Sequence, residues 1–255
     1  MKPEKRISNF LSRIESGNLD IFIRFLLQKP ALAPTFIWTM NLSHIREVNS
    51  DPESFAFLES NSLIVADGWP VKYLVRVIDS REVHRIPGVD IVDQLLDSGV
   101  RFCVIGSDRV QVLSTLQNQN RARSELTFVY DEYIDIDSEI QIDEITQLLL
   151  RVNPRFIFLA LGFPKQEILF EKIRIKIPQM PSYFLGVGGS FQMLSGEKVR
   201  APQKLQNLGL EWLWRLSQDP KRLFSRYYAD GKFFLSLALK REAKKVHGFL
   251  VKGKR

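Results

Sequence analysis

Short apolar runs alternate along this chain with longer amphipathic segments. The runs are rich in β-branched and aromatic residues, which predicts buried strands at residues 35–40, 62–66, 101–105, 126–130, 155–161 and 183–185. The segments between them have helical spacing, including one at residues 1–33 and one that opens with Pro52 in its first turn. Strands alternating with helices predict an α/β fold, with a mostly parallel sheet wrapped by helices.

Polar residues and glycines follow most of the predicted strands. Parallel sheets bind ligands beyond the carboxyl ends of their strands, so these positions form the candidate site. They are Thr39 and Asn41, Asp67 and Gly68, Gly106 and Ser107, residues 162–167, and residues 186–190.

The glycine turn after the last predicted strand is the centre of this candidate site. Gly186, Gly188 and Gly189 allow positive φ and a close approach of the backbone to a ligand. Ser190 suits the N-cap of a following helix, and such a turn favours an anion, usually phosphate. A purely structural turn is the alternative. Phe191 stands where a dinucleotide-binding fingerprint has its third glycine, which argues against that class.

Asp67 is the candidate general base. It directly follows an apolar run, and burial at a strand end raises the pKa of a carboxyl toward working pH. Thr39 and Asn41 lie two apart at another strand end, where both can point into one site. For all three residues the alternative is a turn or helix-capping role.

The loop after residues 155–161 places a cation and an amide behind a glycine. Gly162, Lys165 and Gln166 suit a phosphate or a base edge. The alternative is simple helix initiation, with a proline at the first position and Glu167 in the first turn. Arg85 is either a phosphate clamp or an ordinary surface arginine.

No metal site is expected. Asp135 and Asp137 form a DxD motif, which holds a divalent metal in many sugar transferases, but the acidic run around them is typical of a solvated loop. His44, His84 and His247 show no ligand spacing.

Composition and charge narrow the class of protein. A chain of 255 residues suits one large domain, or one domain with an appendage, and the single cysteine fits a reducing cytosol. No stretch resembles a signal peptide or reaches the length of a membrane span. The net charge of +7 is unevenly distributed. Residues 212–255 carry twelve Lys or Arg and three Asp or Glu, whereas residues 1–211 carry 24 Lys or Arg and 26 Asp or Glu. This asymmetry predicts an anionic partner for the tail, either nucleic acid or a membrane surface.

Several short motifs occur in a specific order. The first are TxN at 39–41, ADG at 66–68, RxxG at 85–88, GxPKQE at 162–167 and GVGGSFxxLSG at 186–196. They are followed by RAP at 200–202, GLEW at 209–212, RL at 215–216, DPKR at 219–222 and RYY at 226–228. The ordered set, which covers roughly residues 36–228, resembles the WecG/TagA/CpsF family of bacterial glycosyltransferases.

The resemblance implies an inverting transferase that acts without a cofactor or metal in cell-wall or exopolysaccharide biosynthesis. It would move a hexose, N-acetylmannosamine or a related sugar, from a UDP-sugar to a lipid-linked (polyprenyl diphosphate) sugar acceptor. The expected domains are a Rossmann-like catalytic domain at 1–211 and a basic C-terminal appendage at 212–255. The expected location is cytoplasmic and peripheral on the inner face of the cell membrane, with an anionic membrane surface and no nucleic acid as partner.

Motif positions also imply roles for particular residues. Asp67 becomes the catalytic base, with Thr39 and Asn41 beside it. The residues expected to bind substrate, because they match motif positions near the sugars or the diphosphate, are Arg85, Gly162, Lys165, Gln166, Gly186, Gly188, Gly189, Ser190, Arg215 and Arg222.

Two other classes of function are alternatives. A nucleic-acid-binding protein could use the basic tail, but the tail has no recognisable nucleic-acid motif. A Rossmann-type nucleotide-dependent oxidoreductase is disfavoured by the broken fingerprint. Binding of UDP without binding of NAD would remove this second class.

The tail at 232–255 is expected to form an amphipathic helix. Its apolar positions recur at spacings of three and four and are flanked by cations, the pattern of a helix lying in a membrane surface. Packing on the domain, or on a second subunit in a homo-oligomer, is the alternative. The apolar positions are Leu235, Leu239, Ala243, Val246 and Leu250, and the cations are Lys240, Arg241, Lys244 and Lys245.

Reversal of these four cations to Glu tests the membrane interpretation. Flotation with anionic liposomes should fall sharply, because each cation contributes about 1 kcal/mol near an anionic leaflet. Activity on a membrane-embedded acceptor should fall with it, whereas activity on a short soluble acceptor analogue should survive. Flotation equal to that of the unmodified protein would rule out docking through this helix.

Overall fold

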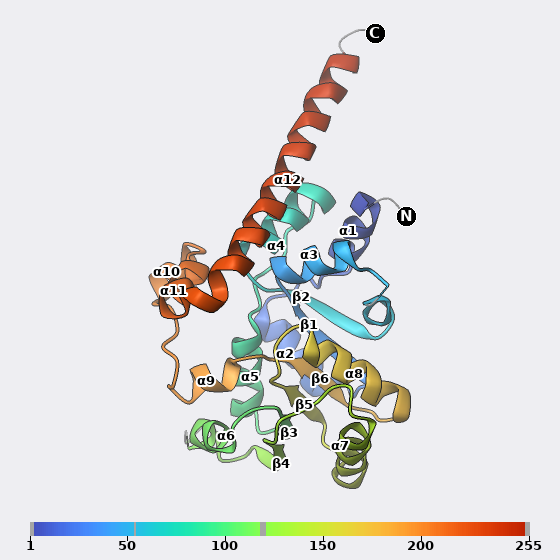
Figure 1. Cartoon of the computed structure of the whole chain (residues 1–255), viewed down its shortest axis with the longest axis vertical. Coiled ribbons are helices and arrows are strands. Elements are labelled where there is room, and N and C mark those ends of the chain that lie inside the picture. Colours follow the sequence, from blue (N-terminus) through green and yellow to red (C-terminus); the bar gives the residue numbers. More distant parts are fainter. Residues whose placement is uncertain (1–2, 54, 118–120, 253–255) are drawn as a thin grey trace.

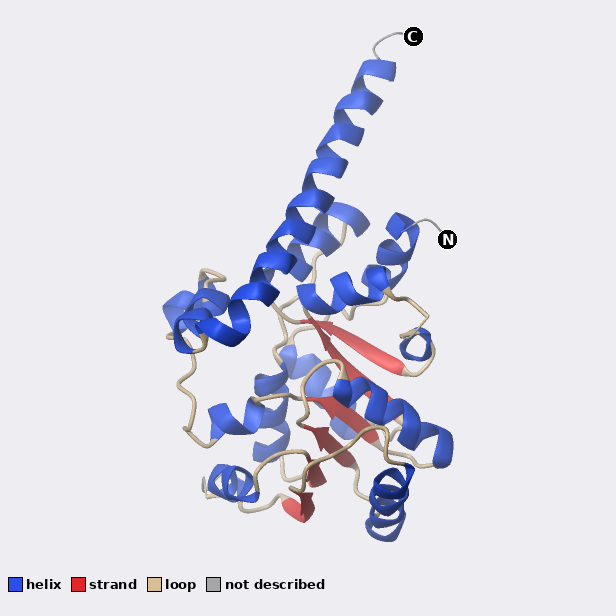
Figure 2. Cartoon of the chain, in the orientation of Figure 1, coloured by secondary structure: helices blue, strands red, loops and turns tan. Residues whose placement is uncertain are grey.

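One sheet of parallel strands forms the centre of the protein (Figure 1; Figure 2). The computed structural model describes residues 3–53, 55–117 and 121–252. The order along the sheet is β2-β1-β6-β5-β3-β4, and each pairing in it is parallel. The strands are β1 (Thr35–Met40), β2 (Ser62–Ala66), β3 (Arg101–Ile105), β4 (Glu125–Tyr130), β5 (Phe156–Leu159) and β6 (Tyr183–Gly186). The predicted α/β fold is confirmed, and it is Rossmann-like.

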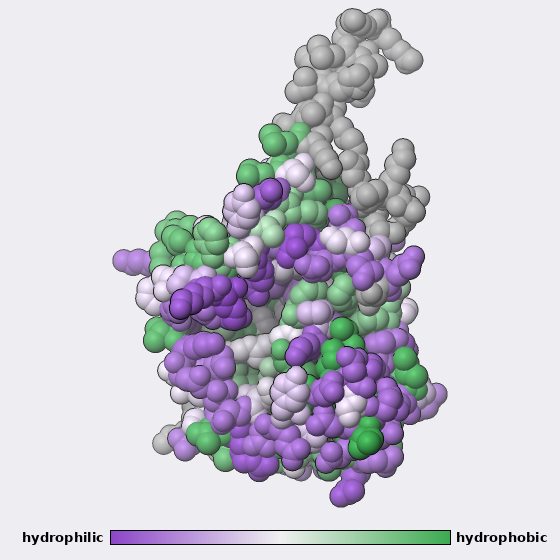
Figure 3. Space-filling model, in the orientation of Figure 1, coloured by the Kyte–Doolittle hydropathy of each residue, from purple (hydrophilic) through white to green (hydrophobic). Residues whose placement is uncertain are grey.

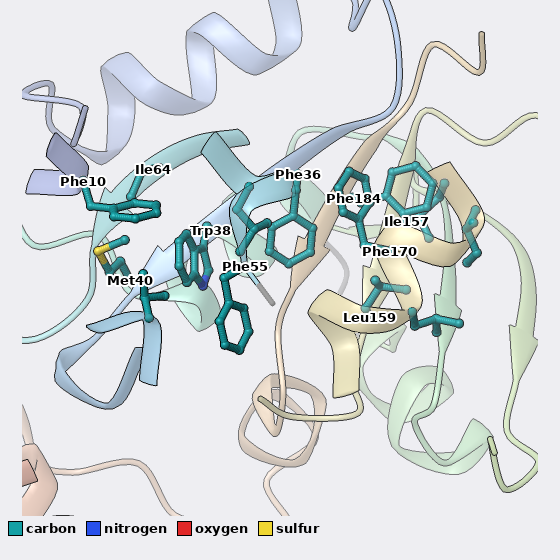
Figure 4. Packing of buried hydrophobic residues seen from close by; sticks show 14 of the residues in the cluster. Phe10, Phe36, Trp38, Met40, Phe55, Ile64, Ile157, Leu159, Phe170 and Phe184 are labelled. Atoms are coloured by element: carbon teal, nitrogen blue, oxygen red, sulfur yellow. The ribbon is translucent and has the colours of Figure 1, made fainter. Parts of the chain in front are cut away.

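Helices cover both faces of the sheet, which explains why its central strands are mostly apolar. β5 reads FIFL, and all four of its residues are buried. On one face the ring centroids of Phe36 and Phe170 lie 4.9 Å apart, and those of Phe170 and Phe184 lie 5.1 Å apart (Figure 4). This face packs against α1 (Pro3–Ser12), α3 (Leu42–Ser50), α4 (Trp69–Leu74), α7 (Glu139–Val152) and α8 (Lys165–Lys176). The opposite face packs against α2 (Leu19–Gln28), α5 (Gly88–Asp97), α6 (Arg109–Leu116) and α9 (Ser190–Leu194).

Two of the expected helices differ from the structure. Residues 1–33 do not form one helix, because Asn18 caps a new helix by accepting a hydrogen bond from the Ile21 N–H, 3.0 Å away. Before this cap Ile14 forms a bridge to Ile64 of β2, which requires extended backbone. Pro52 and Glu53 lie in a bend and not in an α-helix, and the 3₁₀ helix η1 (Ala56–Glu59) follows.

A long helix ends the described chain. α10 (Gln203–Asn207) and α11 (Glu211–Gln218) lead into α12 (Pro220–Lys252), whose far half extends away from the body (Figure 1). The centroid of the Phe234 ring of α12 lies 5.3 Å from that of the Trp69 ring, so this part of the helix packs on the body. Leu235 and Leu239, by contrast, are exposed. The side chains of residues 240–255, which include the four predicted cations, lie outside those that the structure describes. Among the described helices, none combines the length and the apolar character needed to cross a bilayer.

A buried carboxylate fastens α12 to α3. Asp230 is 5 % exposed, and its two oxygens accept hydrogen bonds from the Ser43 hydroxyl at 2.5 Å and from Arg46 Nε at 2.8 Å. Hydrogen bonds to charged groups are stronger than those between neutral groups. This contact therefore fixes where α12 leaves the body.

Replacing this carboxylate should loosen the helix. We expect Asp230→Ala to lower the free energy of unfolding by about 2 kcal/mol, because it leaves the buried Ser43 hydroxyl without its acceptor and removes an acceptor from the half-buried Arg46. Urea denaturation measures the change. Glu82→Ala, which removes an exposed ion pair with Arg76, is the control and should have little effect. Equal stability of the two variants would contradict this role of Asp230.

Candidate active site

A cleft of about 850 Å³ lies at the carboxyl ends of the strands. Figure 3 shows a hollow on this face of the molecule, below the C-terminal helices. Most of the residues predicted from the sequence line the cleft: Thr39, Asn41, Asp67, Gly106, Ser107, Gly162, Gln166, Gly186, Gly188, Gly189, Ser190, Arg215 and Arg222. The structure thus brings together segments that are far apart along the chain.

Two of the residues expected to bind substrate do not line the cleft, and neither do Gly68, Pro164 and Glu167 of the wider candidate site. Lys165 is exposed at the start of α8, and its Nζ lies 5.8 Å from the centroid of the Tyr133 ring. Arg85 is half-buried outside the residues that line the cleft, and it donates a hydrogen bond from Nη1 to Glu211, at 2.8 Å. Glu211 itself lines the cleft, so Arg85 influences it through this contact.

Asp67 occupies the end of β2 beside these charged groups. Its backbone N–H donates to the carbonyl of Met40, 2.8 Å away, which fixes it against the end of β1. Burial raises the pKa of the Asp67 carboxyl to about 6, although Arg215 opposes the shift. A carboxyl with this pKa is ionised at neutral pH and still takes up a proton readily.

Glu211 binds two arginines from different motifs. It accepts from Arg85 on one side, and from Arg215 Nη2 and Nε on the other, at 2.5 and 3.1 Å. Burial alone would raise the pKa of Glu211, but the two arginines lower it below its ordinary value. The group as a whole keeps a net positive charge close to Asp67.

Asn41 and His44 form a reciprocal cap at the start of α3. The Asn41 side chain accepts from the His44 N–H at 3.2 Å, and the Asn41 N–H donates to His44 Nδ1 at 3.1 Å. The capping role considered for Asn41 is therefore present, and both side chains also line the cleft. Burial lowers the pKa of His44 to about 3, so its imidazole is neutral.

The glycine turn uses its glycines for different reasons. Gly188 has φ of 48°, which favours glycine. A Cβ on Gly186 would lie 2.4 Å from Gln166 Nε2, so only glycine leaves room for that amide. The N-cap of α9 is Gly189, and the expectation for Ser190 was wrong: its hydroxyl donates to the Val187 carbonyl at 2.7 Å instead of accepting from the helix.

The DxD motif makes local contacts. Asp135 accepts from the Asp137 N–H at 3.0 Å, and Asp137 lies 3.7 Å from Lys172 Nζ. Within the described residues, no group of three or more His, Cys, Asp or Glu side chains is placed to hold a metal ion.

Comparison with known proteins identifies the family. The model of the glycosyl transferase WecG/TagA/CpsF family matches residues 10–247. The chain belongs to this family. It is therefore a glycosyltransferase, as the ordered motifs predicted.

Curated relatives carry a specific name. The N-acetylglucosaminyldiphosphoundecaprenol N-acetyl-beta-D-mannosaminyltransferase of Staphylococcus aureus is 29% identical over 228 residues, which cover 83% of this chain and 87% of the relative. The enzyme of the same name from Bacillus spizizenii is 30% identical over 225 residues, covering 86% and 81%. The Bacillus subtilis enzyme is 29% identical over 203 residues, covering 77% and 76%.

The cleft of this glycosyltransferase also contains residues to which the sequence assigned no role. Glu211 belongs to the GLEW motif and Arg226 to RYY, so the family motifs contained a signal for both. Arg200 of the RAP motif lines the cleft and donates to Asp90 of α5 at 2.5 Å. His44 lies in no motif, and its reciprocal cap with Asn41, three residues earlier, places it at the site.

The close packing at Gly186 can be tested directly. We expect Gly186→Ala to lower the free energy of unfolding by about 1–3 kcal/mol, because the new methyl group overlaps the Gln166 amide and approaches Phe36 to 3.0 Å. Gly231→Ala, in open space on α12, is the control and should raise stability by up to about 1 kcal/mol. If both variants were as stable as the unmodified protein in urea denaturation, the packing at Gly186 would not be tight.

Proposed function

We propose that this glycosyltransferase moves a hexose of the N-acetylmannosamine type from a UDP-sugar to a lipid-linked, polyprenyl diphosphate sugar acceptor, with inversion. The observation that carries the proposal is the placement of Asp67, with its raised pKa, in the cleft together with Arg215. The names of the relatives, which specify a diphosphoundecaprenol-linked acceptor and a mannosaminyl group, support the choice of substrates.

Asp67 acts as the general base in this proposal. Its carboxylate removes the proton from the acceptor hydroxyl, and the oxygen attacks the anomeric carbon from the face opposite UDP. The bond from that carbon to the diphosphate oxygen breaks, and UDP leaves with the electron pair. Attack from the opposite face inverts the configuration at the anomeric carbon.

Arginines in the cleft suit the charge that develops on the leaving diphosphate. Arg215, Arg222 and Arg226 all line it, and guanidinium groups stay charged and bind phosphate oxygens in pairs. Fixed cations placed where charge grows lower the barrier to its formation. We place the diphosphate between these arginines and the glycine turn, and propose that transfer proceeds without a metal.

The same placement supports a proposed division of the chain. We propose residues 1–211 as the catalytic domain and residues 212–255 as an appendage that completes the active site, because Arg215, Arg222 and Arg226 come from the second segment. The appendage also exposes Phe224 and Tyr228, at 64 % and 61 %. Aromatic and basic side chains suit an anionic membrane surface, so we propose a peripheral enzyme on the inner face of the cell membrane.

Substitution of the base tests the proposal. We expect Asp67→Asn to lower turnover by about 10²–10⁴-fold, as loss of a general base does, while UDP still binds. Below pH of about 6 Asp67 takes up a proton, so kcat/KM of the unmodified enzyme should fall as the pH is lowered through this value. Rates with a UDP-sugar and a lipid-linked acceptor, together with calorimetric binding of UDP, measure both effects.

A matched control separates catalysis from general damage. Asp143→Asn makes the same change on the surface of α7, where Asp143 pairs with Lys176, and should leave turnover unchanged. Turnover of Asp67→Asn within threefold of the unmodified enzyme would place the base elsewhere. Failure of the unmodified enzyme to bind UDP would refute the proposed donor.

A further inference from the structure

A buried carboxyl lies behind the cleft and takes no part in the proposed mechanism. Glu167, in the first turn of α8, is 0 % exposed. Its Oε1 accepts a hydrogen bond from Gln166 Nε2 at 3.0 Å, and its Oε2 has no hydrogen-bond partner among the described residues. Gln166 and His44 stand between this carboxyl and the cleft, and both line it.

The nearest side chain that could carry a positive charge is neutral. His44 Nε2 lies 4.0 Å from Glu167 Oε1. His44 Nδ1 accepts the Asn41 N–H, so the single proton of the neutral ring is on Nε2, facing Glu167. Burial lowers the pKa of His44, and Arg226 on α12 lowers it further. Burial also raises the pKa of Glu167 to about 7.

Stability does not explain a carboxyl at this position. A buried carboxyl without an ionic partner, and with one oxygen lacking a hydrogen bond, destabilises the folded state. An apolar side chain of the same length would avoid that loss. A function that requires an acceptor at this point is the remaining reason for Glu167.

The Gln166 amide is the group that depends on this acceptor. Its Oε1 accepts the Gly188 N–H at 3.2 Å, while its Nε2 donates to Glu167 and packs against Gly186. The two ends of an amide have almost the same shape, so packing alone does not select one orientation. In the reversed orientation the NH₂ group would face the Gly188 N–H, and the amide oxygen would face the carboxyl.

We propose that Glu167 is a positioning residue for donor binding, whose carboxyl fixes the orientation of the Gln166 amide. The correctly oriented amide then holds Gly188 and the glycine turn in the conformation that accepts the UDP portion of the donor. This inference rests on the proposed function, in which the diphosphate lies at that turn. Glu167 acts through Gln166 and does not itself contact the substrate.

Three variants of the protein test the inference. Glu167→Met removes the acceptor and retains the length of the side chain, whereas Glu167→Gln retains a carbonyl that can accept from Gln166. Glu171→Met makes the first change one turn further along α8, where Glu171 pairs with Arg174, and is the control. Calorimetry measures the Kd for UDP of each variant, and thermal unfolding without ligand measures Tm.

The inference predicts opposite effects on stability and on binding. Glu167→Met should keep or raise Tm, because removal of a buried carboxyl with an unpaired oxygen offsets the Gln166 Nε2 donor left without its acceptor. It should nevertheless weaken UDP binding threefold or more, in line with the loss of about one hydrogen bond. Glu167→Gln and Glu171→Met should bind UDP within threefold of the unmodified protein. A merely structural role would lower Tm and leave the Kd of the folded fraction unchanged.

Two results would overturn the inference. One is a Kd for Glu167→Met within threefold of that of the unmodified protein, and the other is a loss of affinity in Glu167→Gln as large as that in Glu167→Met. If Glu167→Met does not fold, Glu167→Ala is judged by the same threefold criterion. Failure of the unmodified protein to bind UDP would refute the proposed donor, whereas normal binding with no effect of Glu167 would refute this inference alone.

Discussion

The parallel alignment of the strands is the constraint on which the rest of this structure depends. Because each paired strand runs in the same direction, the carboxyl ends meet at one edge of the sheet. Backbone polar groups inside the sheet are satisfied by their neighbours, which leaves both faces free to be covered by apolar helices. Residues at or just beyond the ends of different strands, such as Thr39, Asp67 and Gly188, consequently line one cleft.

The charged residues of this cleft come from two parts of the fold, the sheet and the C-terminal helices. The sheet places Asp67 at the end of β2, and the C-terminal helices bring Arg215, which shares Glu211 with Arg85. Burial raises the pKa of Asp67 while the arginines oppose the rise, so the carboxyl remains ionisable near neutral pH. The contact of Asp230 with α3 matters for the same reason, because it fixes the helix that carries Arg222 and Arg226 relative to the sheet.

The buried polar side chains at the back of the cleft are constrained by hydrogen bonding. Gln166 and His44 line the site, and Glu167 lies behind them with few alternatives for hydrogen bonding. Polar groups in such surroundings tolerate few orientations, because each orientation that leaves a donor facing a donor is costly. A buried polar layer of this kind can determine the conformation of a glycine turn that has little side-chain packing of its own.

The pattern of apolar runs and strand-end polar residues was enough to predict the α/β class, the six strands and most of the cleft, because strand burial and turn chemistry are local properties of a sequence. The ordered motifs in addition predicted the family. Only the tertiary structure could place Arg85 behind Glu211, direct Lys165 away from the cleft, and bring His44 to within 4.0 Å of Glu167. These outcomes depend on which helices pack together and on the direction in which each side chain leaves its helix, and neither is encoded in the local pattern of residues.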